Sequence, residues 1–214
     1  MIDLLVSLLK GIPATLMVTL GAFAIGAVAA VPLSLMRRSR SHLLRIPARI
    51  YIDVVRGIPP IVWLFIIFFG LGNGVIVLSS LQAAILGMGL VSTAYLAEIY
   101  RGGFLALSSG QQEASMALGM TRIDALRYVL APQVLRVCLP PMATFLVGLL
   151  KATTVASTIG VRDVMMYASQ QAQGGSGNFT PFILAALLYI LLSIPVAVMA
   201  RVLDERLRAR GKAK

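Results

Sequence analysis

The chain has 214 residues, of which 58% are hydrophobic and 13% are charged, and its mean hydropathy is +0.89. A soluble domain has about 45–50% apolar and about 25% charged residues, so this composition excludes a soluble globular domain. It also excludes a disordered chain, which has the opposite balance. The formal net charge of +11 raises the question of a nucleic-acid partner. No nucleic-acid partner is expected, because the basic residues alternate with apolar segments instead of clustering on one solvated face.

Long segments without charged residues predict membrane-spanning helices. A helix rises about 1.5 Å per residue, so about 20 apolar residues cross the ~30 Å of bilayer hydrocarbon. The spans must be helical, because an open sheet leaves backbone groups unpaired in lipid. We therefore predict an all-α integral membrane protein with a single transmembrane domain over residues 1–214. Its five expected spans cover about residues 12–36, 59–72, 81–100, 139–159 and 181–202.

The second expected span is the shortest. Its apolar stretch covers only residues 58–71, which is less than a level crossing of the hydrocarbon requires. Either residues 50–56 or residues 75–78 extend it, or its helix is tilted within a bundle. Pro59 and Pro60 suit the start of a helix, where their missing N–H groups would have no partner in any case.

The basic residues predict the orientation of the spans. Six lie between spans one and two, four between spans three and four, and six in the C-terminal tail from Arg201 onward, which together make sixteen of the 19 basic residues. Lys and Arg gather in cytoplasmic loops. The N-terminus is therefore expected outside the membrane and the C-terminus in the cytoplasm, and an odd number of spans places the two ends on opposite sides.

The cytoplasmic loop between spans three and four, residues 101–138, is long for a bundle connection, and a long ordered loop is usually functional. Ser109 followed by Gln112 has the form of a capping box, so a helix is expected over about residues 110–118. Gly119 should end this helix in a left-handed conformation.

A second short helix is expected after this glycine. Thr121, with Asp124 three residues later, can cap its start. The helix should end before Pro132, because a residue that precedes proline disfavours the helical conformation.

One face of the first loop helix is small and apolar. Ala114, Ala117 and Leu118 share this face at helical spacing. Such a face suits close docking into a groove on a partner protein. The alternative is a pair of interfacial helices that rest on the lipid headgroups.

The loop resembles the EAA motif of bacterial ABC importer permeases, whose pattern is E-A-A-x3-G-x9-I-x-L-P. Glu113, Ala114, Gly119 and Pro132 match in register, and the chain departs from the pattern at Ser115, Val129 and Ala131. Further segments resemble the branch of this family that imports polar amino acids, and the resemblance covers roughly residues 12–205. These segments are Arg56-Gly57-Ile58-Pro59-Pro60, Ala97-Glu98-Ile99-Tyr100-Arg101-Gly102-Gly103, Gly110-Gln111, and Leu149-Leu150-Lys151 with Thr153, Ala156-Ser157 and Ile159-Gly160-Val161. In the last segment Ala152 stands where the family usually has Asp, and Thr154 replaces Ser.

The resemblance implies a type I ABC importer permease-like fold in the bacterial cytoplasmic (inner) membrane. The chain would form the translocation pore as a dimer, with a second copy or with a sister permease. A pair of ABC ATPase subunits would receive the loop over residues 109–132 in a surface groove. A periplasmic or lipid-anchored substrate-binding protein would deliver the amino acid. The resemblance assigns coupling to the ATPase to Glu113, Ala114, Ser115, Ala117, Leu118, Gly119 and Pro132. For Glu113 the alternative is an interaction with the dipole of its own helix.

Lys151 is the charged residue expected well inside a span, about 16 Å from the cytoplasmic start of its helix. Charges inside a membrane usually face a cavity or a partner, so Lys151 is a candidate for the substrate path. A structural ion pair is the alternative. The other candidates for this path are Thr153, Thr154, Ser157 and Glu98, although helix packing also explains the hydroxyl residues, and Glu98 is better placed to pair with Arg101.

The sequence also predicts what the chain does not do. One Cys and one His exclude a disulfide framework and a structural zinc site, and no Lys follows the glycine pattern of a phosphate-binding loop. We therefore expect a non-catalytic transport subunit without a cofactor, with ATP and Mg²⁺ bound by the partner ATPase. The alternatives are a secondary transporter driven by an ion gradient, although no internal repeat is visible, and a membrane assembly subunit that does not transport.

Overall fold

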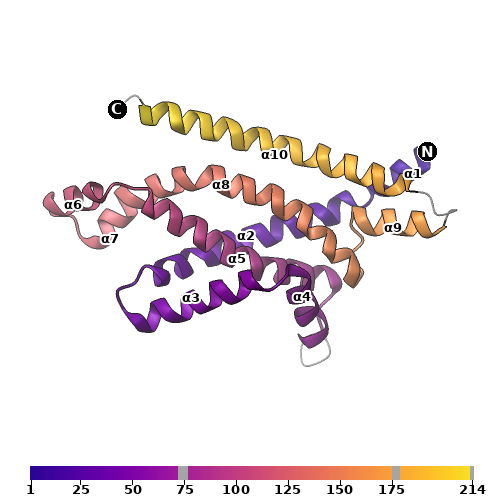
Figure 1. Ribbon diagram of the computed structural model, residues 1–214, viewed down its shortest axis with the longest axis horizontal. Coiled ribbons are helices and arrows are strands. Elements are labelled where there is room, and N and C mark those ends of the chain that lie inside the picture. The colour runs from indigo at the N-terminus through magenta and orange to yellow at the C-terminus, as the bar shows by residue number, and fades with distance from the viewer. Residues whose placement is uncertain (72–76, 175–178, 213–214) are drawn as a thin grey trace.

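A computed structural model describes residues 1–71, 77–174 and 179–212, and all regular structure in these residues is helical. The predicted all-α class is therefore confirmed. Figure 1 shows an elongated bundle whose long helices run roughly along one axis. The elements are α1 (Ile2–Leu9), α2 (Ile12–Arg37), α3 (His42–Gly57), α4 (Pro60–Phe65), the π-helix η1 (Ile66–Leu71), α5 (Ser80–Leu105), α6 (Ser109–Ala117), α7 (Arg122–Asp124), the π-helix η2 (Ala125–Leu130), α8 (Ala131–Ala152), the 3₁₀-helix η3 (Thr153–Ile159), α9 (Val164–Gly174) and α10 (Thr180–Lys212).

Four described segments are long and apolar enough to cross a membrane. They contain the first, third, fourth and fifth spans expected from the sequence. The segments are Ile2–Arg37, Ser80–Leu105, Arg122–Ile159 and Thr180–Val202.

The segment expected as a second span, residues 59–72, has a different form, and residue 72 lies outside the described residues. The chain makes a bend of 103° between α3 and the helix that starts at Pro60. Ile58 and Pro59 are extended here (ψ 134° and 139°), because a residue before proline avoids the helical region. The bent pair adds a fifth candidate span if it crosses as one unit, and the number of crossings stays a prediction.

The core lies between α2 and α5, which pack against each other along much of their length. Small residues allow this close approach, as is common between membrane helices. A Cβ atom added to Gly26 would lie 2.5 Å from the Cβ of Ser92, and one added to Gly89 would lie 3.0 Å from the side chain of Ile25. Ala83, Ala84 and Met88 of α5 are fully buried in the same cluster.

The prediction that the second loop helix ends before Pro132 is wrong. The helix that Thr121 caps continues from α7 through η2 into α8, whose first turn contains Pro132. Proline lacks an N–H group and its ring clashes with the carbonyl four residues earlier. That carbonyl belongs to Tyr128 within η2, where the wider π spacing accommodates the proline.

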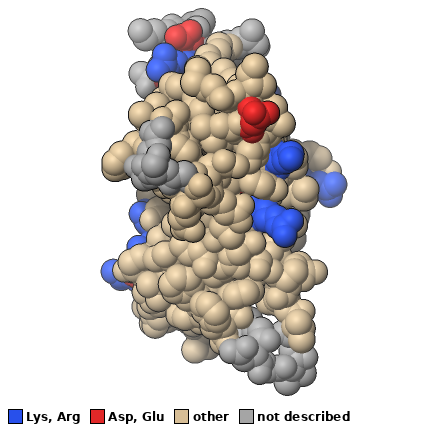
Figure 2. All heavy atoms as spheres, turned by 90° about the vertical axis from the view of Figure 1, so that its right-hand side faces the viewer, with Lys and Arg blue, Asp and Glu red and all other residues tan. Residues whose placement is uncertain are grey.

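The two termini lie at opposite ends of the bundle (Figure 1). We call the end that holds α6 and α7 the basic end, because its connections contain Arg38, Arg40, Arg122 and Arg127. Figure 2 shows the opposite end, where most side chains are uncharged. The side of the membrane that each end faces stays a prediction.

Candidate functional site

The loop at the basic end consists of α6, a glycine turn and α7. Gly119 has φ +76°, as predicted, and its N–H group donates to the Met116 carbonyl while the N–H of Met120 donates to the Ser115 carbonyl. This pair of bonds is the Schellman motif, which ends a helix at a left-handed residue. The next helix starts at Thr121, whose hydroxyl accepts from the N–H of Asp124 at 3.2 Å. The predicted helix–glycine–helix arrangement is confirmed, except that Ser108 replaces Ser109 as the first cap and makes no side-chain bond.

The residues predicted to couple to an ATPase from Glu113 to Leu118 divide into an exposed set and one that faces inward. Glu113, Ala114, Ala117 and Leu118 are exposed, and Leu118 is 83% exposed. Ser115 instead faces inward, where its hydroxyl donates to the Gln111 carbonyl at 2.7 Å. The exposed residues of α6 therefore form a surface that a partner can reach.

A packing contact and a hydrogen bond hold α6 against the rest of the bundle. α6 packs against η2, and the Gln133 amide of α8 donates to the Gln111 side-chain oxygen at 3.0 Å. Pro132 lies beside Gln133 at the start of α8. A force applied to α6 would therefore reach α8 directly.

Lys151 lies in a hollow between α8 and α10. One cavity of about 420 Å³ is lined by Lys151 and Thr154 together with Tyr189 and Ser193 of α10. A second cavity of about 390 Å³ adjoins Lys151 on the other side and is lined also by Arg201. Lys151 and Ala197 line both, and we call the two cavities together the Lys151 groove. Because Lys151 lies beside the middle of the apolar segment of α10, its charge faces a hollow at the centre of a predicted span.

The other residues predicted for the substrate path do not all share this groove. Thr153 faces α2 instead: it is 1% exposed, and its hydroxyl donates to the Leu150 carbonyl at 2.8 Å and lies 3.3 Å from the Thr19 hydroxyl. The hydroxyl of Ser157 donates to the Thr154 carbonyl at 2.7 Å and lies outside the lining of the groove. Of the three predicted hydroxyl residues, Thr154 is the one that lines the groove with Lys151.

Glu98 lies away from the groove, towards the basic end. It forms an ion pair with Arg101, from Nη2 to Oε2 at 2.8 Å, and its Oε1 is 3.8 Å from Nε of Arg37. The pairing with Arg101 was expected from the spacing of three residues. Neither cation is Lys151.

Sequence reasoning missed the contribution of α10 to the groove. Tyr189, Ser193 and Ala197 follow one another at intervals of four residues, which places them on one helix face. A stripe of small and polar residues on an otherwise apolar span was therefore visible in the sequence. Arg201 was assigned to the basic tail, although it lies one further turn along the same face.

A buried carboxylate lies outside the membrane-spanning segments, between η3 and α9. Asp163 is 1% exposed, its Oδ1 accepts from the N–H of Met166 at 2.8 Å, and its Oδ2 is buried without a hydrogen-bond partner among the described residues. Burial raises the pKa of Asp163 to about 6, against the hydrogen bonds to backbone N–H groups, which lower it. Asp163 therefore caps α9, although burial disfavours its ionised form.

Comparison with known proteins places this geometry among transport proteins. Residues 6–209 match the family described as "Binding-protein-dependent transport system inner membrane component". The chain is 36% identical, over 92% of its length and 88% of the relative, to the probable amino-acid ABC transporter permease protein YckA of Bacillus subtilis. It is 35% identical, over 93% and 85%, to the octopine transport system permease protein OccM of Rhizobium radiobacter.

Solved structures share the fold. A crystal structure of an amino acid ABC transporter with histidines contains a chain that superposes with a TM-score of 0.85 at 30% identity, over 94% of both chains. A chain of the MetNI methionine ABC transporter in an inward-facing conformation superposes with a TM-score of 0.81 at 23% identity, over 92% of this chain and 95% of that one. The helical arrangement is therefore that of ABC importer permeases.

Proposed function

This chain belongs to the family of binding-protein-dependent transport system inner membrane components and is a permease subunit of an amino acid ABC importer, and from that premise we propose how its residues move a polar amino acid across the membrane. The subunit pairs with a second permease, either another copy or a sister chain. The pair forms the pore in the bacterial cytoplasmic membrane, with the N-terminus outside and the C-terminus in the cytoplasm. A substrate-binding protein delivers the amino acid from outside.

Coupling to ATP hydrolysis occurs through the loop over residues 109–132. The observation that supports this step most strongly is the exposed α6 surface, held on one side by the Gly119 turn and on the other by the bond between Gln133 and Gln111. ATPase subunits receive α6 in a groove, and their closure moves α6 towards its counterpart in the second permease. Because η2 and α8 are continuous, this movement is passed to the helix that holds Lys151.

The Lys151 groove is the part of this subunit that contacts the amino acid. Lys151 can bind the carboxylate of the substrate, and the hydroxyls of Thr154 and Ser193 can bind its other polar groups. Lys151 is exposed to the groove but stands between apolar helices, where the lower dielectric constant makes its attraction for an anion stronger than in bulk water. Thr153, Ser157 and Glu98 lie outside the lining of this groove, and we assign them to helix packing and ion pairing.

The subunit supplies no catalytic group of its own. ATP and Mg²⁺ bind to the partner ATPase, which performs the hydrolysis. The permease supplies the pore and the mechanical connection to it.

Reconstitution of the complete transporter tests this function. The chain, its ATPase and its second permease are placed in proteoliposomes together with the substrate-binding protein, and ATP hydrolysis and uptake are measured across a panel of polar amino acids. We expect at least one of these amino acids to stimulate hydrolysis and to accumulate only when ATP is present.

Two results would overturn the proposal. Uptake that follows an imposed ion gradient without ATP would identify a secondary carrier. A lack of stimulation by every amino acid in the panel, in a preparation whose ATPase is active, would remove the substrate class.

A further inference from the structure

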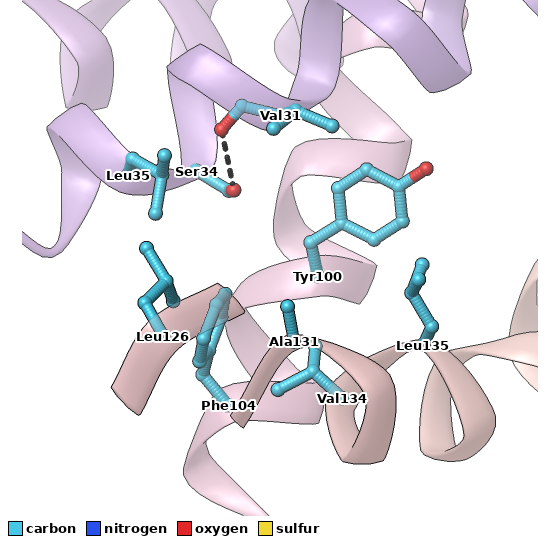
Figure 3. Close-up of a pocket in the computed structure, with 9 residues that line it drawn as sticks. All are labelled: Val31, Ser34, Leu35, Tyr100, Phe104, Leu126, Ala131, Val134 and Leu135. Carbon is cyan, nitrogen blue, oxygen red and sulfur yellow. Dashed lines mark hydrogen bonds between the residues drawn. The ribbon is translucent and has the colours of Figure 1, made fainter. Parts of the chain in front are cut away.

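A further cavity lies at the basic end, remote from Lys151. It has a volume of about 170 Å³ and is enclosed by α2, α5, η2 and α8 (Figure 3). Val31 and Leu35 belong to the last two turns of α2, Phe104 to the last turn of α5, and Ala131 to the first turn of α8. The cavity therefore lies at the depth where the spans end.

The cavity offers few hydrogen-bonding groups to water. Two of its lining residues have hydroxyl groups, and both hydroxyls already have partners: Ser34 donates to the Val31 carbonyl at 2.8 Å (Figure 3), and Tyr100 donates to the Ala27 carbonyl at 3.1 Å. A buried water needs two to four polar partners. The space is thus suited to an apolar occupant.

The cavity opens on the outer surface of the bundle. The apolar residues at its rim are exposed, Val31 by 47%, Leu35 by 38% and Leu135 by 53%. Its inner wall is closed, because Tyr100 and Val134 are only 6% and 4% exposed. The opening is therefore reached from outside the subunit, at the basic end of the bundle.

A basic side chain stands beside the apolar cavity. Arg38 follows Val31, Ser34 and Leu35 on the same face of α2, at the spacing i, i+3, i+4 and i+7. Its guanidinium lies 3.7 Å from the centre of the Phe104 ring, which forms part of the cavity wall.

Arg38 has no acidic partner among the described residues. The ion pairs found there use Arg37, Arg49 and Arg101. Partial burial lowers the pKa of Arg38, as expected for a cation that lacks a nearby carboxylate. A phosphate group is the anion that a planar guanidinium at a membrane surface binds well.

We propose that this cavity binds an anionic phospholipid, with part of one acyl chain between α2, α5 and α8 and the headgroup phosphate on Arg38. The acyl chain fills a space whose walls otherwise lose van der Waals contacts. The phosphate neutralises Arg38. The lipid thereby connects the end of α2 to the start of α8, next to the loop formed by α6 and α7.

Photolabelling of the complete transporter in lipid nanodiscs tests this site. One probe is a phosphatidylglycerol with a photoreactive diazirine on an acyl chain, and the second is the phosphatidylcholine with the same chain. Labelled peptides are mapped by mass spectrometry in the wild type and in the variants Ala131→Phe, Ala131→Leu and Arg38→Gln. Arg40→Gln, which changes a nearby exposed arginine, and Leu187→Phe, which changes an exposed residue of α10, are the matched controls.

We expect the phosphatidylglycerol probe to label peptides that contain residues 31–35 and 126–135. Ala131→Phe should reduce this labelling to background. Ala131→Leu adds less volume and should reduce the labelling in part, so it tests the site even where the Phe variant does not assemble. Arg38→Gln should lower labelling by phosphatidylglycerol about five-fold, the factor that corresponds to one basic residue at an anionic surface. It should lower labelling by phosphatidylcholine less, because the choline cation of that lipid already neutralises its phosphate. The two controls should behave as the wild type does.

Three results would overturn the site. One is equal labelling by both probes in the wild type. Another is labelling that no substitution of Ala131 or Arg38 changes in an assembled transporter. The third is labelling of the isolated subunit that disappears in the complete transporter, which would show that a protein partner occupies the cavity.

Discussion

The contact between α2 and α5 and the contact between α8 and α10 join apolar helices in two different ways. At the first, glycines bring two backbones together, and 67% of the most apolar stretch of α5 is buried. At the second, 17% of the corresponding stretch of α10 is buried, and the two helices enclose the Lys151 groove. A packed interface resists change, whereas an open one can widen and close. From this difference between α5 and α10 we propose that α2 and α5 form a fixed frame and that α8 and α10 line the moving path.

The largest effect is expected when one glycine in each region is replaced by leucine, which tests whether the two contacts are packed differently. Gly26→Leu would force a side chain into Ser92 of α5, where even a Cβ atom lies at 2.5 Å. Overpacking costs about 3 kcal/mol, and more where a backbone cannot move, so we expect a large loss of folded subunit. The measurement is the yield and thermal unfolding of the purified protein.

The matched variant is Gly148→Leu on α8, where nothing lies within 4 Å of an added Cβ. It should fold normally and lose transport instead, because Gly148 lines the Lys151 groove. Equal destabilisation by the two variants would show that the groove is as tightly packed as the frame.

The buried charge of Asp163 provides a second test of the packed frame. The Asp163 backbone lies directly against Gly11, at the start of α2, so the stability of this region should depend on that charge. The pKa of an aspartate in an unfolded chain is about 3.9, and burial raises that of Asp163 to about 6. Between these values the folded protein binds more protons than the unfolded chain, so its stability falls as pH rises from about 4 to about 6 and is constant above. Asp163→Asn should remove this slope and raise the free energy of unfolding at pH 7.5 by about 3 kcal/mol, because one pKa unit corresponds to about 1.4 kcal/mol.

Thermal unfolding between pH 4.5 and pH 7.5 measures this effect. Asp3→Asn, which changes an exposed carboxylate on α1, is the control and should leave the slope unchanged. If Asp163→Asn lowers stability at pH 7.5, then the cap on α9 outweighs the cost of the buried charge.

Lys151 tests the open region without disturbing the frame. Lys151→Met keeps the length of the side chain and removes its charge. Because Lys151 is exposed in the groove, we expect normal folding and about a ten-fold loss of uptake, the effect of about 1.4 kcal/mol of lost attraction for a substrate carboxylate. ATP-driven uptake in proteoliposomes measures it, with Arg162→Met, at an exposed cation outside the groove, as the control. Unchanged uptake in Lys151→Met would remove the groove from the substrate path.

The smallest expected effect concerns the connection between the two regions and the ATPase. Gly119→Ala places a Cβ atom on a residue with φ +76°, which costs about 1 kcal/mol. We expect the subunit to remain in the membrane and the ratio of uptake to ATP hydrolysis to fall about five-fold. Gly110→Ala, in the same loop, has only an ordinary contact of 3.5 Å and no positive φ, and it should leave the ratio unchanged. An unaltered ratio in Gly119→Ala would contradict the role of this turn in coupling.

Local signals in the sequence predicted much of this molecule. Charge-free stretches located four long apolar segments, and Gly119 and Thr121 located the turn between the two loop helices, because a left-handed glycine and a threonine cap act within a few residues. The same local rules failed at Pro132. A π turn, which depends on how α7 and α8 continue into each other, allowed the helix to pass through the proline.

The groove was harder to predict, because it depends on which helices become neighbours. The sequence identified Lys151 as a charge out of place. It did not reveal that Thr153 turns towards α2, or that Tyr189 and Ser193 approach Lys151 from α10. Helices α8 and α10 are separated in sequence by α9, so spacing along the chain contains no information about this contact.

Cysteine accessibility at Ala197, which lines both cavities of the Lys151 groove, tests most directly whether the groove is the moving path. The native Cys138 is fully buried, so a cysteine introduced as Ala197→Cys can be followed with a hydrophilic maleimide, with Ser92→Cys in the frame as the unreactive control. We predict that Ala197→Cys reacts in the reconstituted transporter, that ATP changes its rate several-fold, and that the transported amino acid slows it. A rate that neither ATP nor substrate alters, in a transporter that still imports, would contradict the assignment of the groove to the path.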